Sequence, residues 1–139
     1  MLTEADGGPL AVALAPANRH DSLVLQDVLE AVVVDPPNPV TGPTQHLCLD
    51  NAFDGAPSEA VAAVFGYAAH VRRIGEEKKD ARGRKTKPAR RWVVERTIAW
   101  LNKCRGLLTR YEKKAANYLG LVQTAGDLLW YRRKVRLTT

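Results

Sequence analysis

The sequence is poor in features that would place it in a special class of protein. It has only two cysteines in 139 residues, no internal repeat, and no apolar run near the roughly 20 residues of a membrane helix. Two acids and no basic segment precede the first apolar stretch, which is not the pattern of a secretory signal. Two isolated thiols indicate neither a disulfide framework nor a zinc site, so we expect Cys48 and Cys104 to be reduced core residues. A cytoplasmic protein without membrane contact is therefore expected.

The composition is that of an ordinary globular protein. Hydrophobic residues make up 45% of the chain and charged residues 26%, which argues against disorder. The length allows one domain with a single hydrophobic core and is too short for two domains.

Positive charge is in excess and is concentrated in one segment. The formal net charge is +6, which favours polyanionic partners because their counterions are released on binding. Residues 72–91 carry three acids, Glu76, Glu77 and Asp80, against a larger set of bases. These bases are Arg72, Arg73, Lys78, Lys79, Arg82, Arg84, Lys85, Lys87, Arg90 and Arg91. A solvated basic loop and a phosphate-binding loop both agree with this pattern.

The first half of the chain is predicted to alternate strands and helices. Asp-Gly between the apolar runs 2–5 and 10–15 indicates a hairpin. A helix from about 21 to 33, capped by Asp21 or Ser22, should follow. A buried strand is predicted at 46–50, a helix opened by Ser58 at 58–65, and a strand at 67–74.

The second half is predicted to be helical. Val94, Ile98, Leu101 and Leu108 recur at the spacing of one helix face, which predicts a helix over about 90–111. After a polar break, a last helix over 118–133 should carry one apolar face and end in a basic tail. Its apolar residues are Leu121, Ala125, Leu128 and Leu129. The order of elements predicts an α/β fold with helices packed on a mixed sheet.

Two acids are candidates for metal chemistry. Asp50 follows the apolar triplet LCL, which places it at the C-terminal end of a strand, where α/β folds usually hold functional groups. Glu95 is one turn into the long helix, in the most basic part of the chain, and Asp54 is a third acid nearby. Carboxylates that converge from a strand end and a helix suit Mg²⁺, a hard cation, and phosphodiester chemistry. The residues alone leave the alternative open that Asp50 is a strand-end cap and that Glu95 pairs with Arg91.

Four blocks of the sequence, in this order, resemble a known family. They are ANRHDS followed by a helix, LCLDNAFD, VVERTIAWLNKCRGLLTRYEK and NYLGLVQTAGDLLWYRR. Together they are similar to the C-terminal part of the DDE transposases of bacterial insertion sequences, in the insertion-sequence-5-like branch. The resemblance covers nearly the whole chain.

The resemblance implies a ribonuclease H-like fold and a metal-dependent enzyme that cleaves and joins DNA strands. Asp50 corresponds to the second catalytic Asp and Glu95 to the catalytic Glu, so both are expected to bind Mg²⁺ or Mn²⁺. Arg91 corresponds to the family's arginine. DNA of the element ends and of the target is the implied partner, together with self-association or an upstream-frame partner, in the bacterial cytoplasm at the nucleoid. The residues expected to contact DNA are Arg82, Arg84, Lys85, Lys87, Arg90, Arg91, Arg96 and Lys103. Trp92 and Trp100 are expected to be packed on their helix or to stack on a flipped base.

The sequence departs from the family at three places. Pro88 stands where the family often has tyrosine, and Asn102 where it often has lysine; Lys103 is adjacent but turned by about 100° on a helix. The family's first catalytic Asp lies on a strand that precedes the hairpin at 2–15, so the catalytic set is expected to be incomplete.

Loss of that central strand would leave backbone groups unpaired. The chain is therefore expected to be unstable alone or to pair with another segment, as the product of a second reading frame or of a decayed element. Two functions stay open: a portion of a transposase, or a basic DNA-binding or partner-binding remnant without chemistry.

Overall fold

A computed structural model describes residues 1–35, 37–38, 40–71 and 91–138 of the chain. The order of its elements is two strands, helix, strand, helix, strand and three helices, with short 3-10 turns before the first helix and after the third strand. The predicted α/β class is confirmed. None of the described helices is both long and apolar enough to cross a membrane.

The chain begins with a short antiparallel hairpin of β1 (Leu2–Thr3) and β2 (Pro9–Ala11). The turn between them is closed by two backbone hydrogen bonds, from Glu4 N to Gly8 O at 2.8 Å and from Gly7 N to Glu4 O at 2.9 Å. Gly7 has a φ of 86°, a left-handed conformation that glycine adopts without steric cost. The hairpin signalled by Asp-Gly is thus confirmed, although both strands are shorter than the predicted runs.

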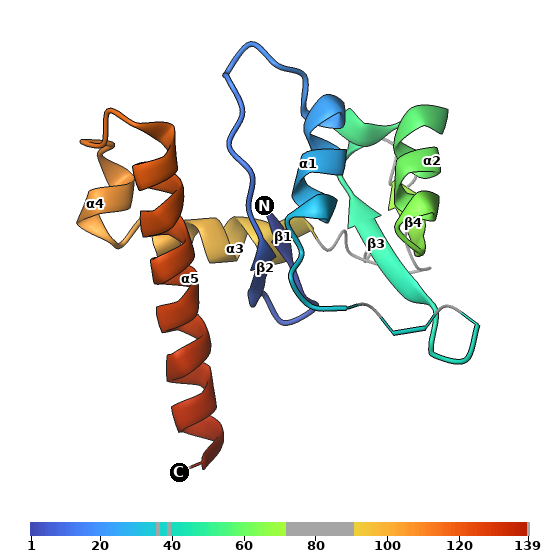
Figure 1. The fold of residues 1–139 in the computed structure, drawn as a ribbon. Coiled ribbons are helices and arrows are strands. Elements are labelled where there is room, and N and C mark those ends of the chain that lie inside the picture. Colours follow the sequence, from blue (N-terminus) through green and yellow to red (C-terminus); the bar gives the residue numbers. More distant parts are fainter. Residues whose placement is uncertain (36, 39, 72–90, 139) are drawn as a thin grey trace, which may run out of the picture.

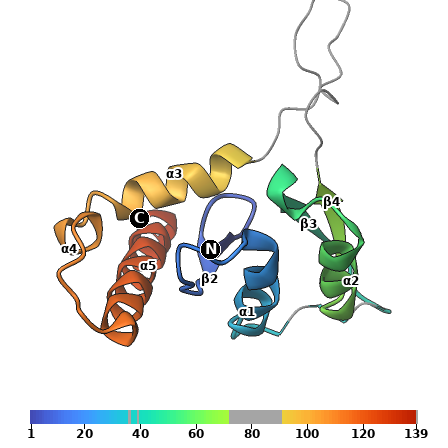
Figure 2. The ribbon, with the colours of Figure 1, turned by 90° about the horizontal axis from the view of Figure 1, so that it is seen from above.

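A parallel pair of strands forms the second sheet. β3 (Gln45–Leu49) pairs with β4 (Tyr67–Val71), with Gln45 opposite Tyr67. Parallel strands need a crossover connection, and here α2 (Ala56–Val64) provides it. Buried side chains of β3, α2 and α1 (Leu25–Glu30) pack together in a first hydrophobic cluster, and Figures 1 and 2 show the three elements side by side. Its buried members are Leu25, Leu29, Leu47 and Ala62.

The three C-terminal helices form a second hydrophobic cluster. They are α3 (Arg91–Leu101), α4 (Arg105–Leu108) and α5 (Ala115–Thr138), which is the long helix on the left of Figure 1. The buried members of this cluster are Leu101, Leu107, Val122 and Ala125.

The hairpin lies between α1, which belongs to the first cluster, and α5, which belongs to the second (Figure 2). Leu2 packs against the first cluster, whereas Met1 and Val12 pack against the second. Of the twelve buried apolar residues among those described, eight belong to these two clusters, in place of the single core that was predicted. The described residues also contain two separate two-stranded sheets in place of the one mixed sheet that was expected.

The helix starts of the first half differ from the prediction. Asp21–Val24 is a 3-10 turn whose cap is His20, which accepts a hydrogen bond from Ser22 N at 3.3 Å, so the predicted caps Asp21 and Ser22 were wrong. Helix α1 ends at Glu30 and not at Val33, which is 91% exposed. Helix α2 is capped by Gly55, and Ser58 is buried inside its first turn.

The strands of the first half lie close to their predicted positions. Strand β3 begins and ends one residue earlier than predicted, and β4 is described to Val71. Only Leu47 of β3 is buried, so the strand has one covered face and one open face. The prediction of a core position was wrong for Cys48, which is exposed on the open face, whereas Cys104 is half-buried beside the second cluster.

The predicted helix at 90–111 is interrupted. Helix α3 ends at Leu101, and a tight turn follows in which Lys103 N donates to Trp100 O and Cys104 N to Leu101 O. Cys104 is extended, with φ −79° and ψ 109°, and starts α4. The prediction of one continuous helix was therefore wrong. With the turn in place, Leu101 before it and Leu107 after it are both buried in the second cluster.

The last helix is longer than predicted, and its buried face differs in part from the predicted face. It runs from Ala115 to Thr138, so the basic tail is helical and not a separate end. Its buried positions are Val122, Ala125, Gly126 and Leu129, while Leu121 and Leu128 are about 40% exposed. On α3 the buried residues are Val93, Thr97 and Leu101. The predicted stripe is thus confirmed at Leu101 and wrong at Ile98 and Leu108, which are 42% and 66% exposed.

Candidate functional site

Asp50 lies where the sequence predicts it, directly after the last residue of β3. Its backbone is extended, with φ −74° and ψ 162°, and it caps the 3-10 turn Asn51–Phe53. One carboxylate oxygen accepts a hydrogen bond from Asn51 N at 2.7 Å, and the residue is half-buried. Asp50 is therefore a cap, as the first alternative proposed, and it also places a carboxylate at the carboxyl edge of a parallel pair of strands.

Asp54 closes the same turn from its other end. Its backbone N–H donates to Asn51 O at 3.0 Å, and its side chain is exposed. The two acids thus flank a single turn of 3-10 helix at the edge of the sheet.

Glu95 lies in the first half of α3 and is exposed. Arg96, the next residue, contacts both the hairpin and a tryptophan of its own helix. The guanidinium of Arg96 donates to Asp6 O at 2.6 Å and lies over the ring of Trp92, 4.7 Å from its centroid. Thr97, the next residue, is 3% exposed, and its hydroxyl donates to Gly7 O at 2.7 Å. The residues after Glu95 therefore join α3 to the hairpin turn.

Within the described ranges, no group of three or more His, Cys, Asp or Glu side chains is arranged to hold a metal ion. Asp50 and Glu95 accordingly stay a predicted pair of ligands, not an observed metal centre. Asp50 is half-buried and Glu95 is exposed, so the burial of these two carboxylates does not by itself indicate a metal site.

Most of the bases predicted to contact DNA lie outside the described residues. These are Arg82, Arg84, Lys85, Lys87 and Arg90; Arg91 begins α3, but its side chain is not described. Lys103 is exposed in the turn after α3. Arg96 is exposed as well, although part of its hydrogen-bonding capacity is taken by Asp6.

The hairpin turn is also held by α5, which the sequence analysis missed. Arg133 forms an ion pair with Glu4, with 2.7 Å between Nη1 and Oε1, and a short hydrogen bond with Asp6 O. Trp130 Nε1 donates to Pro9 O at 2.8 Å. The contacts join residues 121 to 129 positions apart, so no local pattern signals them.

Glu4 is the acid at the centre of these contacts. Partial burial raises its pKa, but hydrogen bonds from Gly8 N and Arg133 outweigh burial and hold the pKa below its ordinary value. Glu4 is therefore ionised near neutral pH and keeps its pairing with Arg133.

The tryptophans of α3 differ in their surroundings. Trp92 is 51% exposed under Arg96, whereas Trp100 is half-buried beside the second cluster. Arg132 of α5 lies over the Trp100 ring, 5.7 Å from its centroid. Packing on neighbouring residues thus accounts for Trp100.

Comparison with known proteins decides the family. The family described as "Transposase DDE domain" matches residues 1–126. The chain belongs to the transposase DDE domain family. The resemblance inferred from four sequence blocks is thereby confirmed at the level of the family.

A curated relative agrees with this DDE-domain assignment. The chain is 30% identical over 122 residues to a protein of Burkholderia cepacia named "Putative transposase for insertion sequence element IS402". The matched region covers 83% of this chain and 53% of that protein, so the DDE-domain chain spans about half the length of its relative. No solved structure matches the chain.

Proposed function

We propose that this chain supplies two of the catalytic carboxylates of an insertion-sequence transposase, Asp50 and Glu95, and acts in DNA strand cleavage and strand transfer. Membership in the transposase DDE domain family supports the reaction class. The position of Asp50 at the carboxyl edge of parallel strands β3 and β4 carries its assignment, and Glu95 is assigned from its place in the sequence block that begins VVERT. We assign the chain to the insertion-sequence-5-like branch on its four sequence blocks.

A ribonuclease H-like arrangement is part of the proposal. The parallel strand pair joined by a helical crossover, with an acid after the first strand, is compatible with a portion of such a fold and supports the proposal. The hairpin and the parallel pair are separate sheets among the described residues. We propose that a strand from a longer transposase joins them and brings the first catalytic Asp.

The donor chemistry of Asp50 and Glu95 fits a hard divalent cation. Both are carboxylates, and Mg²⁺ and Mn²⁺ prefer oxygen ligands. When bound, such an ion supplies the Lewis acidity that phosphodiester cleavage needs. The cap that Asp50 makes with Asn51 N holds its carboxylate at the sheet edge, and the contacts of Arg96 and Thr97 with the hairpin fix the helix that carries Glu95.

The bases of the chain are proposed to bind the DNA that is cut, in the bacterial cytoplasm at the nucleoid. Counterion release from phosphates favours a chain with a net charge of +6. The predicted contacts include the segment 72–91 and Arg96, one position after Glu95 in the sequence. Synapsis of two DNA ends would also need more than one copy of the protein.

Metal binding tests the two ligands directly. We expect Asp50→Asn and Glu95→Gln each to weaken Mn²⁺ binding at least tenfold, measured by electron paramagnetic resonance of the unbound ion. In a longer chain that supplies the third carboxylate, both variants should abolish Mg²⁺-dependent nicking of an element end.

Glu59→Gln on the exposed surface of α2 is the matched control and should bind Mn²⁺ as the unaltered chain does. Unchanged nicking by Asp50→Asn or Glu95→Gln would refute the ligand assignment. Salt-dependent DNA binding without cleavage, even with the third carboxylate supplied, would instead support the alternative of a binding remnant.

A further inference from the structure

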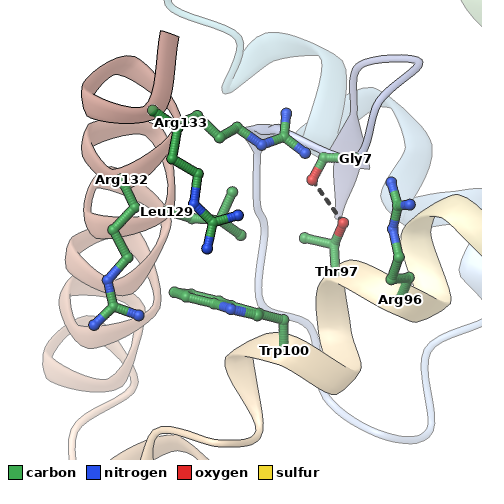
Figure 3. Close-up of a pocket in the computed structure, with 8 residues that line it drawn as sticks. Gly7, Arg96, Thr97, Trp100, Leu129, Arg132 and Arg133 are labelled. Carbon is green, nitrogen blue, oxygen red and sulfur yellow. Dashed lines mark hydrogen bonds between the residues drawn. The ribbon is translucent and has the colours of Figure 1, made fainter. Parts of the chain in front are cut away.

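A pocket of about 220 Å³ opens between α3, α5 and the turn of the hairpin. Figure 3 shows Arg96, Thr97 and Trp100 of α3 on one side and Arg132 and Arg133 of α5 on the other. Arg136 completes the lining. Four arginines thus share one small pocket, which lies outside the pair Asp50 and Glu95.

Helix periodicity explains how the arginines meet. Arg96 and Trp100 are four residues apart on α3, and Arg132 and Arg136 are four residues apart on α5. Residues at this spacing lie one above the other on the same helix face. Helices α3 and α5 pack against each other, so the two pairs line opposite walls of the pocket.

The charge of this pocket is only partly compensated. Of the four arginines, Arg133 alone pairs with a carboxylate among the residues that the structure describes, that of Glu4. Arg96 is held by the Asp6 carbonyl and the Trp92 ring, and Arg132 lies over Trp100. These neutral partners hold the Arg96 guanidinium and contact that of Arg132, and they leave both charges in place.

Uncompensated guanidinium groups that share a pocket favour an anion. Like charges that share a pocket repel one another, and an anion between them removes the repulsion. The planar guanidinium matches phosphate oxygens with two parallel hydrogen bonds, and groups already held in position lose less entropy on binding. The volume lies below the roughly 300 to 1,000 Å³ of sites for drug-sized ligands, which suits one phosphate group better than a larger ligand.

We propose that this arginine pocket, lined by Arg96, Arg132 and Arg136 with Trp100 as one wall, binds a phosphate group of a DNA strand. The lining of the pocket includes neither Asp50 nor Glu95, and of the bases predicted to contact DNA it contains Arg96. Assignment of the phosphate to DNA rests on the proposed function, whereas binding of a phosphate group rests on the pocket alone.

The salt dependence of DNA affinity tests the pocket. The double variant Arg132→Gln/Arg136→Gln removes two exposed arginines and leaves the hairpin contacts of Arg96 and Arg133 intact. We expect the slope of log affinity against log salt concentration to become shallower by about 0.9, the loss of one phosphate contact. Lys113→Gln/Lys114→Gln, which removes the same charge from the exposed segment before α5, should leave the slope unchanged.

Free phosphate gives the second arm of the experiment. Inorganic phosphate and pyrophosphate should shift the indole N–H resonance of Trp100 saturably in the unaltered chain, and an oligonucleotide duplex should compete. The Arg132→Gln/Arg136→Gln variant should lose this shift while its circular dichroism is unchanged.

Two results would overturn the inference. A saturable pyrophosphate shift with an unchanged DNA slope would mean that the pocket takes a small phosphate compound and not a DNA strand. If neither the Trp100 resonance nor the salt slope changed, the arginines would be solvated surface charges that bind no phosphate. We expect Mn²⁺ binding to be unchanged in Arg132→Gln/Arg136→Gln, so that the loss of Mn²⁺ binding in Asp50→Asn or Glu95→Gln tests the proposed metal ligands separately.

Discussion

At the residue scale, one polar side chain decides which face of α3 is buried. An apolar pattern predicted a stripe through Val94, Ile98 and Leu101, but Val93 and Thr97 are buried with Leu101 instead of the first two. Thr97 tolerates burial because its hydroxyl donates to the carbonyl of Gly7 and also lies 3.1 Å from that of Val93. Hydrophobic spacing cannot reveal this, since the partner of Thr97 is 90 positions away in the sequence.

Thr97→Val should therefore destabilise the protein even though it keeps the side chain's shape. The Gly7 carbonyl would lose its buried donor, which costs about 1 to 3 kcal/mol. Urea unfolding at neutral pH measures the change in the free energy of unfolding.

Thr124→Val is the matched control. The Thr124 hydroxyl donates to Gly120 O at 2.8 Å within α5 and is exposed, so its loss should change stability by less than about 0.5 kcal/mol. Equal effects at positions 97 and 124 would contradict a structural role of the contact between Thr97 and Gly7.

The candidate acids illustrate what local sequence does predict. A short apolar run followed by Asp50 predicted a strand and a carboxylate at its end, and both are observed. That prediction succeeded because strand length and capping are local properties. Contacts of the arginine pocket were not predicted, since the residues of α3 and α5 that form it share no sequence window.

At the scale of elements, the hairpin turn is the place where both α3 and α5 contact the N-terminal residues. Gly7 and Gly8 are buried, and the Trp130 ring lies so close to Gly8 that an added Cβ would be 2.3 Å from it. The prediction of the turn rested on its Asp-Gly step. The docking of α3 and α5 on that turn was outside the reach of sequence periodicity.

Gly7→Ala should destabilise the protein by more than about 1 kcal/mol. Its φ of 86° disfavours any side chain, and an added Cβ would lie 2.9 Å from the Thr97 hydroxyl. Thermal unfolding by circular dichroism measures the effect.

Gly120→Ala is the contrasting substitution. Nothing lies within 4 Å of the added Cβ inside α5, so alanine should raise stability by up to about 1 kcal/mol. A gain at both positions would mean that the turn at Gly7 does not need a left-handed residue.

At the scale of the molecule, the two hydrophobic clusters share no buried residue. A single core was expected because the chain length is that of one domain. The hairpin, with Leu2 on one cluster and Met1 and Val12 on the other, connects them.

Substitutions in the two clusters should therefore loosen different parts of the chain. Leu101→Ala should cost about 2 to 5 kcal/mol and speed amide hydrogen exchange in α4 and α5 more than in β3 and β4. Leu47→Ala should produce the reverse order. Uniform acceleration by either variant would indicate one cooperative unit.

The contacts of the hairpin turn also determine when the fold can be completed during translation. Its partners Arg96, Trp130 and Arg133 are 90 to 129 residues downstream. At about 5 to 20 residues per second, the ribosome needs several seconds or more to deliver them. Such long-range pairing slows folding. Until α5 has left the ribosome, the hairpin of β1 and β2 lacks the helix on which it packs.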